Sequence, residues 1–435
     1  MHYLLVEQTK YLSGKVTPPS SKSQSIRGLL LGLLTNGETA LFNPLNSDDI
    51  EACMQVCLEL GVSLSWTKDK LLIKSHGLPI NTKATCIFTQ NSGITTRFIM
   101  PLLGLRQNYN RAIVLDCGAQ MRARPIQSLV TACINLGLNI KYLEAEGRLP
   151  VAISGLLEGG ITEVDGITSQ YLSALLLALP CALQNSEVRV KALHERPYME
   201  MTLNWLNLYK INYHHQREAD FDIFYIKGQQ QYKPRQTTIA ADFSSASYLI
   251  AAAAMLKGEV VLQNIDLQDP QGDKRLIDIL KTMGANIQIT KDELIIKGGN
   301  PLQGISIDAN DIPDLLPTLA VIGTYAEGAT KILNVRQARL KETDRIHSMT
   351  EGLRALGAQV EELADGMIIH KSKLSGSKVK GYDDHRTVMA LAVAGMLAEG
   401  VTAIDTLEAI NKTFPSFVAI MQSLGANLKA GGDKL

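Results

Sequence analysis

Apolar stretches recur along this chain, and several end in the same way. Five have helical periodicity and stop at a Leu or Met followed by glycine, the residue that most often ends a helix in the left-handed conformation. These steps are Leu60-Gly61, Leu136-Gly137, Met283-Gly284, Leu356-Gly357 and Leu424-Gly425. By subtraction, the glycines are 76, 147, 73 and 68 residues apart. The long interval fits two short ones with a degenerate copy near Leu208-Tyr209, so the pattern predicts about six units of about 70 residues.

A second sequence feature recurs in four of the predicted units. In each of them a predicted helix stops at a glycine and a predicted strand follows. The four segments are Gly37-Glu-Thr-Ala-Leu, Gly258-Glu-Val-Val-Leu, Gly328-Ala-Thr-Lys-Ile-Leu and Gly400-Val-Thr-Ala-Ile. Each unit therefore combines helices and strands.

The predicted helix starts are rich in hydroxyl, Lys and Arg side chains. They lie at Ser20-Ser-Lys-Ser-Gln-Ser, Asn91-Ser-Gly, Ala123-Arg-Pro, Thr168-Ser-Gln, Asp242-Phe-Ser-Ser, Ile312-Pro-Asp, Lys341-Glu-Thr-Asp-Arg, Asp384-His-Arg and Lys412-Thr-Phe-Pro. The first amides of a helix are unpaired, and its dipole attracts anions to that end. If these ends converge, they form a cleft suited to a multiply anionic ligand.

Composition excludes several other classes of protein. The chain has 435 residues, of which 46% are apolar and 20% are charged. This length is enough for two domains, each with a full hydrophobic core. Its 43 basic and 43 acidic residues leave no global field, which argues against binding nucleic acid or a membrane surface. The N-terminal residues lack the order of a signal peptide, so we expect a cytoplasmic protein.

The six cysteines show no paired C-x-x-C and no histidine at ligand spacing, which argues against a metal. Cys53 and Cys57 lie one helical turn apart on an apolar stripe, where buried thiols are expected. We therefore expect no metal site.

Two polar breaks divide the chain. Pro18 and Pro19 interrupt the first, and a glutamine-rich run from Gly228 to Gln236 forms the second. They leave three repeats on each side, and a cleft between two such halves is a common place for a ligand.

Two of the polar motifs have two interpretations each. The segment from Lys22 to Arg27 suits a phosphate site, but it is equally well a capped helix start with solvated charges. The segment Lys341-Glu-Thr-Asp-Arg is either a solvated helical face or a place where Glu342 transfers protons. Asp383-Asp-His-Arg repeats that arrangement.

Taken together, the motifs are recognisable. Pro19-Ser-Ser-Lys-Ser-Gln-Ser-Ile-Arg, Asn91-Ser-Gly-Ile-Thr-Thr-Arg, Arg124-Pro-Ile, Thr168-Ser-Gln-Tyr-Leu-Ser, Asp242-Phe-Ser-Ser-Ala-Ser-Tyr, Ile312-Pro-Asp, Lys341-Glu-Thr-Asp-Arg, Asp384-His-Arg and Lys412-Thr-Phe-Pro resemble, in order and spacing, the family of 5-enolpyruvylshikimate-3-phosphate (EPSP) synthases. The match extends from Lys15 to about Phe417.

The resemblance implies an α/β fold, a two-domain inverse α/β barrel in which each domain has three βαβαββ repeats and the active site lies in the interdomain cleft. It implies one domain of residues 19–239 and another of residues 1–18 plus 240–435, with the chain crossing twice between them. We expect a monomer.

The resemblance also implies a reaction. The enolpyruvyl group of phosphoenolpyruvate is transferred to the 5-hydroxyl of shikimate 3-phosphate through a tetrahedral intermediate, with release of phosphate and without metal or cofactor. Residues similar to the family's phosphoenolpyruvate site are Lys22, Gly93, Arg124, Gln170, Arg345, Arg386 and Lys412. Those similar to the shikimate 3-phosphate site are Lys22, Ser23, Arg27, Thr168, Ser169, Gln170, Asp314 and Lys341. The catalytic residues implied are Asp314 as base and Glu342 as acid, with Lys22 and Lys412; for Asp314, a helix cap after Pro313 is an alternative.

Three positions depart from the family pattern. Ile94 and Phe98 stand where Thr and Pro or Leu are usual, and we hypothesise a tightened phosphoenolpyruvate pocket that weakens the inhibitor glyphosate, for which the family is a target. Glu195 replaces a serine near the sugar phosphate, which would bring like charges together. Either Glu195 turns away or the phosphate leans on Arg196.

Two alternative functions stay open at this point. The sister enzyme that acts on UDP-N-acetylglucosamine carries a reactive cysteine before an Arg-Pro, as Cys117 precedes Arg124-Pro125, but it lacks the Lys-Glu-Thr-Asp-Arg motif. A non-catalytic repeat scaffold is the other alternative, and it would not bind shikimate 3-phosphate.

Overall fold

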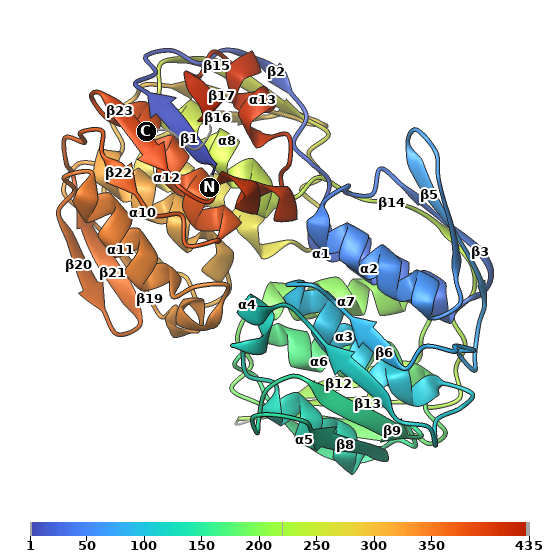
Figure 1. Cartoon of the computed structure of the whole chain (residues 1–435). Coiled ribbons are helices and arrows are strands. Elements are labelled where there is room, and N and C mark those ends of the chain that lie inside the picture. The colour runs from blue at the N-terminus through green and yellow to red at the C-terminus, as the bar shows by residue number, and fades with distance from the viewer. Residues whose placement is uncertain (1, 220, 432–435) are drawn as a thin grey trace. The chain divides into compact units, whose positions relative to one another are not determined.

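Six four-stranded sheets are formed by residues 2–219 and 221–431, which the computed structural model describes (Figure 1). The chain divides into two compact units. The N-unit runs from Ser20 to Ile239, and the C-unit consists of the chain up to Pro19 and from Ala240 onward. Each unit has its own hydrophobic core. Six sheets are what the repeat pattern predicts, and the predicted α/β fold class is confirmed.

The N-unit contains three of the sheets. Their strand orders are β14-β3-β5-β4, β6-β7-β9-β8 and β10-β11-β13-β12. The strands are β3 (Asn36–Phe42), β4 (Ser63–Trp66), β5 (Lys70–His76), β6 (Cys86–Phe88), β7 (Ile113–Asp116), β8 (Leu138–Tyr142), β9 (Val151–Gly155), β10 (Gly160–Asp165), β11 (Ser186–Lys191), β12 (Tyr213–Arg217), β13 (Phe221–Ile226) and β14 (Gln236–Thr238). In each order the first two strands are parallel and the others antiparallel.

The C-unit repeats this plan with strand orders β16-β17-β15-β2, β18-β19-β21-β20 and β22-β23-β1-β24. Its strands are β1 (Tyr3–Glu7), β2 (Gly14–Val16), β15 (Gly258–Gln263), β16 (Asn286–Ile289), β17 (Glu293–Gly298), β18 (Ser306–Asp308), β19 (Ala329–Leu333), β20 (Val360–Leu363), β21 (Gly366–His370), β22 (Lys378–Val379), β23 (Val401–Ile404) and β24 (Leu428–Gly431). The N-terminal segment enters two sheets, because β1 pairs with β23 and β24 and β2 pairs with β15.

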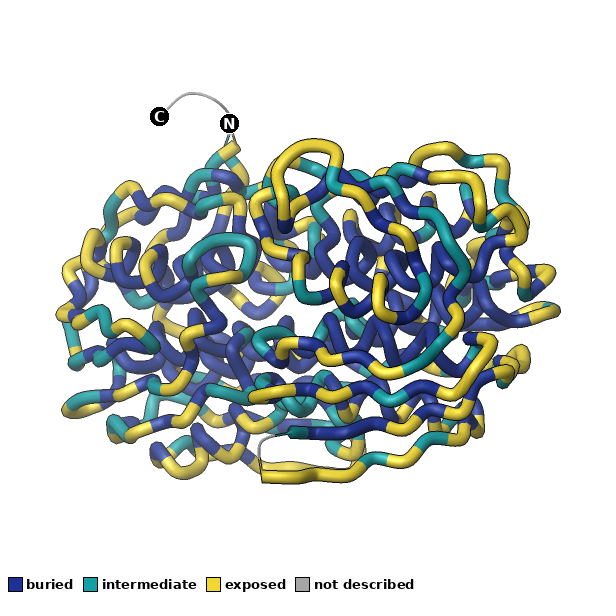
Figure 2. The backbone as a smooth tube through the Cα atoms, turned by 90° about the horizontal axis from the view of Figure 1, so that it is seen from below, coloured by how far each residue is buried: buried dark blue, intermediate teal, exposed yellow. Residues whose placement is uncertain are grey.

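Three helices in each unit are buried on nearly every side and pack on one another (Figure 2). In the N-unit they are α1 (Lys22–Leu34), α3 (Gly93–Leu102) and α6 (Ser169–Ala178), and in the C-unit α8 (Phe243–Met255), α10 (Leu316–Tyr325) and α12 (His385–Leu397). Their charged residues lie in the first half of each helix and the rest of each sequence is apolar or small, which suits a helix with no solvent face. The sheets therefore lie outside a helical centre in each unit.

The remaining α-helices each bury one face. They are α2 (Asp48–Glu59), α4 (Ala119–Arg122), α5 (Gln127–Asn135), α7 (Arg196–Leu208), α9 (Arg275–Met283), α11 (Arg345–Ala355) and α13 (Phe417–Ser423). Short 3-10 turns complete the units: η1 (Leu103–Leu105), η2 (Leu179–Cys181), η3 (Gly272–Lys274), η4 (Pro313–Leu315), η5 (Arg336–Leu340) and η6 (Leu407–Lys412). Among the described residues, no helix is both long and apolar enough to cross a bilayer.

The predicted helix ends are confirmed. Gly61, Gly137, Gly284, Gly357 and Gly425 all have positive φ, between 89° and 104°. The degenerate copy after Tyr209 uses Lys210 in the same conformation, with φ 55°. The predicted strands after Gly37, Gly258, Gly328 and Gly400 are present as β3, β15, β19 and β23.

Two of the predicted helix starts are wrong. Arg124 lies between α4 and α5, because the ring of Pro125 disfavours the helical conformation for the residue before it. Lys412 ends η6 instead of beginning α13, since Pro415 again separates it from the helix.

Candidate active site

The first turn of α1 presents Lys22 and Ser23. Ser21 caps this helix and accepts a hydrogen bond from Gln24 N at 3.4 Å. Lys22 Nζ donates to Asp49 Oδ2, on α2, at 2.8 Å, and both side chains are largely buried. The charge of Lys22 is therefore held in place by an acid from the next helix.

Arg27 lies one turn further along α1 and is 1% exposed. Its Nε donates to Thr202 Oγ1 at 2.9 Å, and Nη2 donates to Tyr198 O at 3.1 Å, both on α7. The guanidinium carbon lies 5.0 Å from the centre of the Phe98 ring. These contacts connect α1 to α7 and α3. Phe98, on α3, is therefore linked to the first turns of α1 through its contact with the Arg27 guanidinium.

Gly93, the first residue of α3, makes room for Arg124. A Cβ at position 93 would lie 2.6 Å from Arg124 Nη1 and 3.3 Å from Met121 Sδ. The absence of a side chain thus permits close approach of the guanidinium to the start of α3.

The first turn of α6 carries Thr168, Ser169 and Gln170. Thr168 is the cap and accepts a hydrogen bond from Gln170 N at 3.4 Å. Arg97, on α3, donates from Nη1 to Gln170 Oε1 at 2.6 Å and lies over the Tyr171 ring. Arg97 thereby orients Gln170 from a neighbouring helix.

Glu195 does not turn away from this helix start. Its Oε2 accepts hydrogen bonds from Ser169 N at 3.1 Å and from Ser169 Oγ at 2.9 Å. Arg196 instead makes a two-pronged ion pair with Asp222, at 3.0 and 2.6 Å. The structure thus decides the orientation that the sequence left open.

In the C-unit, the buried guanidinium of Arg345 joins three carboxylates. It donates from Nε to Asp384 Oδ2 at 2.7 Å, from Nη1 to Asp314 Oδ1 at 2.8 Å and from Nη2 to Glu342 Oε2 at 2.6 Å. Burial alone would lower its pKa, but Asp384, Glu342 and Asp314 raise it well above the usual range. Arg345 therefore stays charged at any working pH.

Asp314 is shared by two arginines, since Arg386 Nη2 donates to its Oδ2 at 2.7 Å. Burial would raise the pKa of Asp314, but Arg386, Lys341 and Arg345 together hold it well below its usual range. In this ion-paired state Asp314 is an ionised but weak base.

Two further acids lie near this group. Asp384 caps α12, and its Oδ1 accepts a hydrogen bond from Arg386 N at 2.8 Å. Asp273, on η3, is 3% exposed and accepts a hydrogen bond from Ser244 Oγ. Burial, and then the charge of Asp314, raise the pKa of Asp273 to about 7.

The predicted lysines of the C-unit lie around this group. Lys341 follows η5 and lies near enough to Asp314 to lower its pKa. Lys412, at the end of η6, donates from Nζ to the backbone oxygen of Asp383 at 2.9 Å. Lys412 is thus linked to the loop that leads into α12.

Sequence reasoning left out three residues that bond to the predicted ones: Asp49, Arg97 and Asp384. Asp384 had a visible signal, because it stands directly before the His-Arg that begins a predicted helix. The other two bond to residues of another helix, at separations of 27 residues for Asp49 and Lys22 and 73 for Arg97 and Gln170.

No cysteine thiol makes any of the contacts described above. Cys53 and Cys57 are buried, as predicted. Burial, and then Asp116, raise the pKa of Cys117 to about 12, so its thiol stays protonated. Within residues 2–219 and 221–431, His, Cys, Asp and Glu side chains form no group of three that could hold a metal ion.

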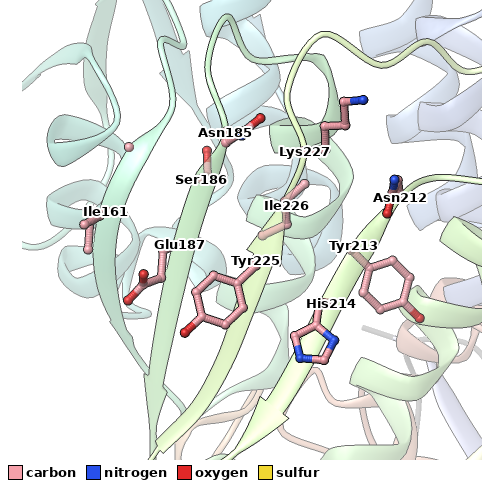
Figure 3. A pocket seen from close by; sticks show the side chains of 11 residues that line it. Ile161, Asn185, Ser186, Glu187, Asn212, Tyr213, His214, Tyr225, Ile226 and Lys227 are labelled. Carbon is pink, nitrogen blue, oxygen red and sulfur yellow. The ribbon is translucent and has the colours of Figure 1, made fainter.

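A hollow of about 460 Å³ lies elsewhere in the N-unit, over the strands β10, β11, β13 and β12 (Figure 3). Tyr225 and His214 stack there with their ring centres 6.0 Å apart. None of the predicted site residues lines it.

Comparisons with known proteins agree over nearly the whole length of the chain. A family model described as EPSP synthase (3-phosphoshikimate 1-carboxyvinyltransferase) matches residues 6–421. The chain is 44% identical over 425 residues to the 3-phosphoshikimate 1-carboxyvinyltransferase of Acetivibrio thermocellus, covering 98% of this chain and 99% of that protein. Its counterpart from Methanocaldococcus jannaschii is 37% identical over 436 residues, covering 99% and 100%. A solved structure of EPSP synthase from Acinetobacter baumannii has a TM-score of 0.83 at 25% identity and covers 99% of this chain and 100% of that one.

Proposed function

The chain belongs to the EPSP synthase (3-phosphoshikimate 1-carboxyvinyltransferase) family, and we propose that the residues gathered in its two units carry out this activity together. The activity belongs to the shikimate pathway of aromatic amino acid biosynthesis. The observation that supports our assignment best is the position of Asp314. Its carboxylate bonds to the guanidiniums of Arg345 and Arg386, and guanidiniums also suit anionic substrates.

The reaction needs a base and an acid in turn. As the 5-hydroxyl oxygen of shikimate 3-phosphate bonds to C2 of phosphoenolpyruvate, the hydroxyl loses its proton and C3 gains one. The tetrahedral intermediate then loses a proton from C3 and breaks the bond from C2 to the phosphate oxygen. We assign the hydroxyl proton to Asp314, which passes it to the departing phosphate. We assign the C3 proton to Glu342, which gives it in the addition and takes it back in the elimination.

Phosphoenolpyruvate itself adjusts the basicity of Asp314 in this proposal. Its phosphate and carboxylate compete with Asp314 for Arg345 and Arg386. As the guanidiniums turn to the substrate, they stabilise the Asp314 carboxylate less, and its pKa rises. The base therefore becomes effective only when its substrate is bound.

The N-unit residues complete the assignment. Lys22, Gly93, Arg124 and Gln170, with Lys412 from the C-unit, bind phosphoenolpyruvate. Ser23, Arg27, Thr168, Ser169 and Gln170, with Lys341, bind shikimate 3-phosphate. Thr202, Ser23 and Tyr198 accept hydrogen bonds from Arg27 and fix the position of its guanidinium.

We propose further that the working form is a cytoplasmic monomer. Light scattering on the purified protein at micromolar concentration tests the oligomeric state, and a mass near twice 47.5 kDa would contradict it.

The experiment that tests the function is phosphate release from phosphoenolpyruvate in the presence of chelator. Shikimate 3-phosphate and UDP-N-acetylglucosamine are offered separately, and we expect release with the first only. Cys117→Ser is the matched variant for the sister activity, and we expect it to keep full turnover. Loss of turnover in Cys117→Ser, or release with the nucleotide sugar, would contradict the assignment; silence with both substrates would favour a binding scaffold.

A further inference from the structure

The carboxylate of Glu195 occupies the amino end of α6. Glu195 is 1% exposed and lies directly before α7. Its Oε2 accepts hydrogen bonds from three donors: Ser169 N at 3.1 Å, Ser169 Oγ at 2.9 Å and Thr168 Oγ1 at 3.5 Å. One backbone amide and two hydroxyls at a helix start thus converge on one carboxylate oxygen.

These donors are the kind that bind an external phosphate. The first amides of a helix point outward and its dipole favours negative charge at that end. Ser169 and Thr168 add two hydroxyl donors to the amides at the start of α6. The Glu195 carboxylate therefore occupies the position that a dianionic phosphate would otherwise take.

The backbone around Glu195 is arranged to deliver this carboxylate. Glu195 has φ 56° and ψ 41°, the left-handed conformation that is strained for a residue with a side chain. Its carbonyl accepts a hydrogen bond from Tyr198 N, which starts the first turn of α7. The strained turn and the start of α7 together set the direction of the side chain.

The neighbouring Arg196 forms an ion pair with Asp222. Arg196 binds Asp222 through both terminal nitrogens, and His215 Nε2 lies 2.9 Å from the same carboxylate. Burial would raise the pKa of Asp222, but Arg196 and His215 hold it below its usual range, so this pair stays charged.

We propose that Glu195 is an internal anion that competes with the phosphate of shikimate 3-phosphate for the start of α6, and so lowers the affinity of the enzyme for this substrate. The inference rests on the proposed function, which places that phosphate at Thr168 and Ser169. Two anions cannot share the same three donors without repulsion. The side chain of Glu195 therefore has to leave before the phosphate binds.

Calorimetric titration of shikimate 3-phosphate at pH 8 tests this proposal. Glu195→Gln keeps the shape of the side chain and removes its charge, and Glu195→Ser removes the competitor altogether. We expect both variants to bind shikimate 3-phosphate about tenfold or more tightly than the wild type, because a charged acceptor no longer has to be displaced. The KM for phosphoenolpyruvate should change by less than about twofold.

The matched control is Glu200→Gln, which removes an exposed carboxylate from α7. This variant should bind shikimate 3-phosphate as tightly as the wild type does. That result would show that the change in net charge alone does not alter the affinity. Inorganic phosphate is titrated in parallel, and we expect it to bind more tightly to both Glu195 variants.

Each other outcome has a clear meaning. Equal or weaker binding of shikimate 3-phosphate by a folded Glu195→Gln variant would overturn the inference, since Glu195 would then be a substrate contact or a mere cap. If Glu195→Ser fails to fold, the Gln variant decides alone. Failure of the wild type and every variant to bind shikimate 3-phosphate would instead reject the proposed function.

Discussion

Arg345 donates from Nε to Asp384 Oδ2 at 2.7 Å, with exposed side-chain fractions of 1% and 0%. The same Asp384 accepts the Arg386 amide at the start of α12. One carboxylate therefore positions one arginine through its side chain and the other through its backbone. A charge so deeply buried is costly unless it is paired, which makes this contact sensitive to substitution.

We predict that Asp384→Asn loosens Arg345 without removing the helix cap, because asparagine also caps helices. The free energy of unfolding should fall by about 3 kcal/mol, as for other broken buried pairs. The KM for phosphoenolpyruvate should rise by roughly tenfold or more. Denaturant titration and steady-state kinetics measure the two effects.

The control for that prediction is Asp344→Asn. Asp344 also caps a helix and also binds an arginine, Arg339, but its side chain is 36% exposed. The unfolding free energy of this variant should change by less than about 1 kcal/mol. Similar losses in both variants would mean that burial of the Arg345 pair has no special importance.

We predict that Lys22→Ala and Asp314→Ala each lower turnover by at least ~10²-fold, as expected for substrate-binding and proton-transfer groups. Lys22→Ala also leaves Asp49 buried without this cation, so thermal stability should fall as well. In Lys22→Ala/Asp49→Ala, stability should recover while turnover stays low. Recovery of turnover in the double variant would show that Lys22 serves structure only.

We predict that Asp273 makes the stability of the protein fall as pH rises from about 4 to about 7. The folded state raises the pKa of this buried carboxyl to about 7, whereas an unfolded aspartate ionises near 3.9. Between these values the unfolded chain has lost a proton that the folded chain keeps, so unfolding becomes more favourable with rising pH.

Asp273→Asn cannot ionise and should lose this dependence. At pH 8 its melting temperature should exceed that of the wild type by a few degrees, about 2–4 °C for each kcal/mol. At pH 4 the two proteins should be nearly equal in stability. A wild-type stability that stays flat across this range, or a lower melting temperature of the variant at pH 8, would contradict the prediction.

We predict that Gly93→Ala displaces Arg124, because the added Cβ would lie 2.6 Å from Arg124 Nη1. The KM for phosphoenolpyruvate should rise by about tenfold, a loss of about 1.4 kcal/mol of binding. Gly431→Ala is the control, since its Cβ would meet Leu5 Cδ1 at an ordinary 3.4 Å. An unchanged KM in Gly93→Ala would show that Arg124 does not bind this substrate.

We predict weak inhibition of the wild type by glyphosate, with the half-inhibitory concentration above the low micromolar range. Ile94 is buried directly beside Gly93, so its bulk is the feature that would narrow the site. Ile94→Thr should lower that concentration. Inhibition of the wild type at low micromolar glyphosate would reject the idea.

Much of the local structure follows from the order of residues. Gly61 and Gly284 end helices because a residue without Cβ enters the left-handed region at little cost. The helices α8 and α12 are buried because their sequences offer no polar face. Lys210 is the exception among the helix ends, where a residue with a side chain takes the conformation that glycine takes elsewhere.

The sequence by itself determined the six repeats, the class of fold, the family and the residue types gathered at the helix starts, because these depend on spacing along the chain. The tertiary structure alone decided which side chains meet. Lys22 bonds to Asp49, 27 residues away in the sequence. Arg345 bonds to Asp384 over 39 residues, and Glu195 bonds to Ser169 over 26. Such pairs form when helices that are separate in the sequence pack side by side and burial makes unpaired charge costly. No local pattern records which charges will be neighbours.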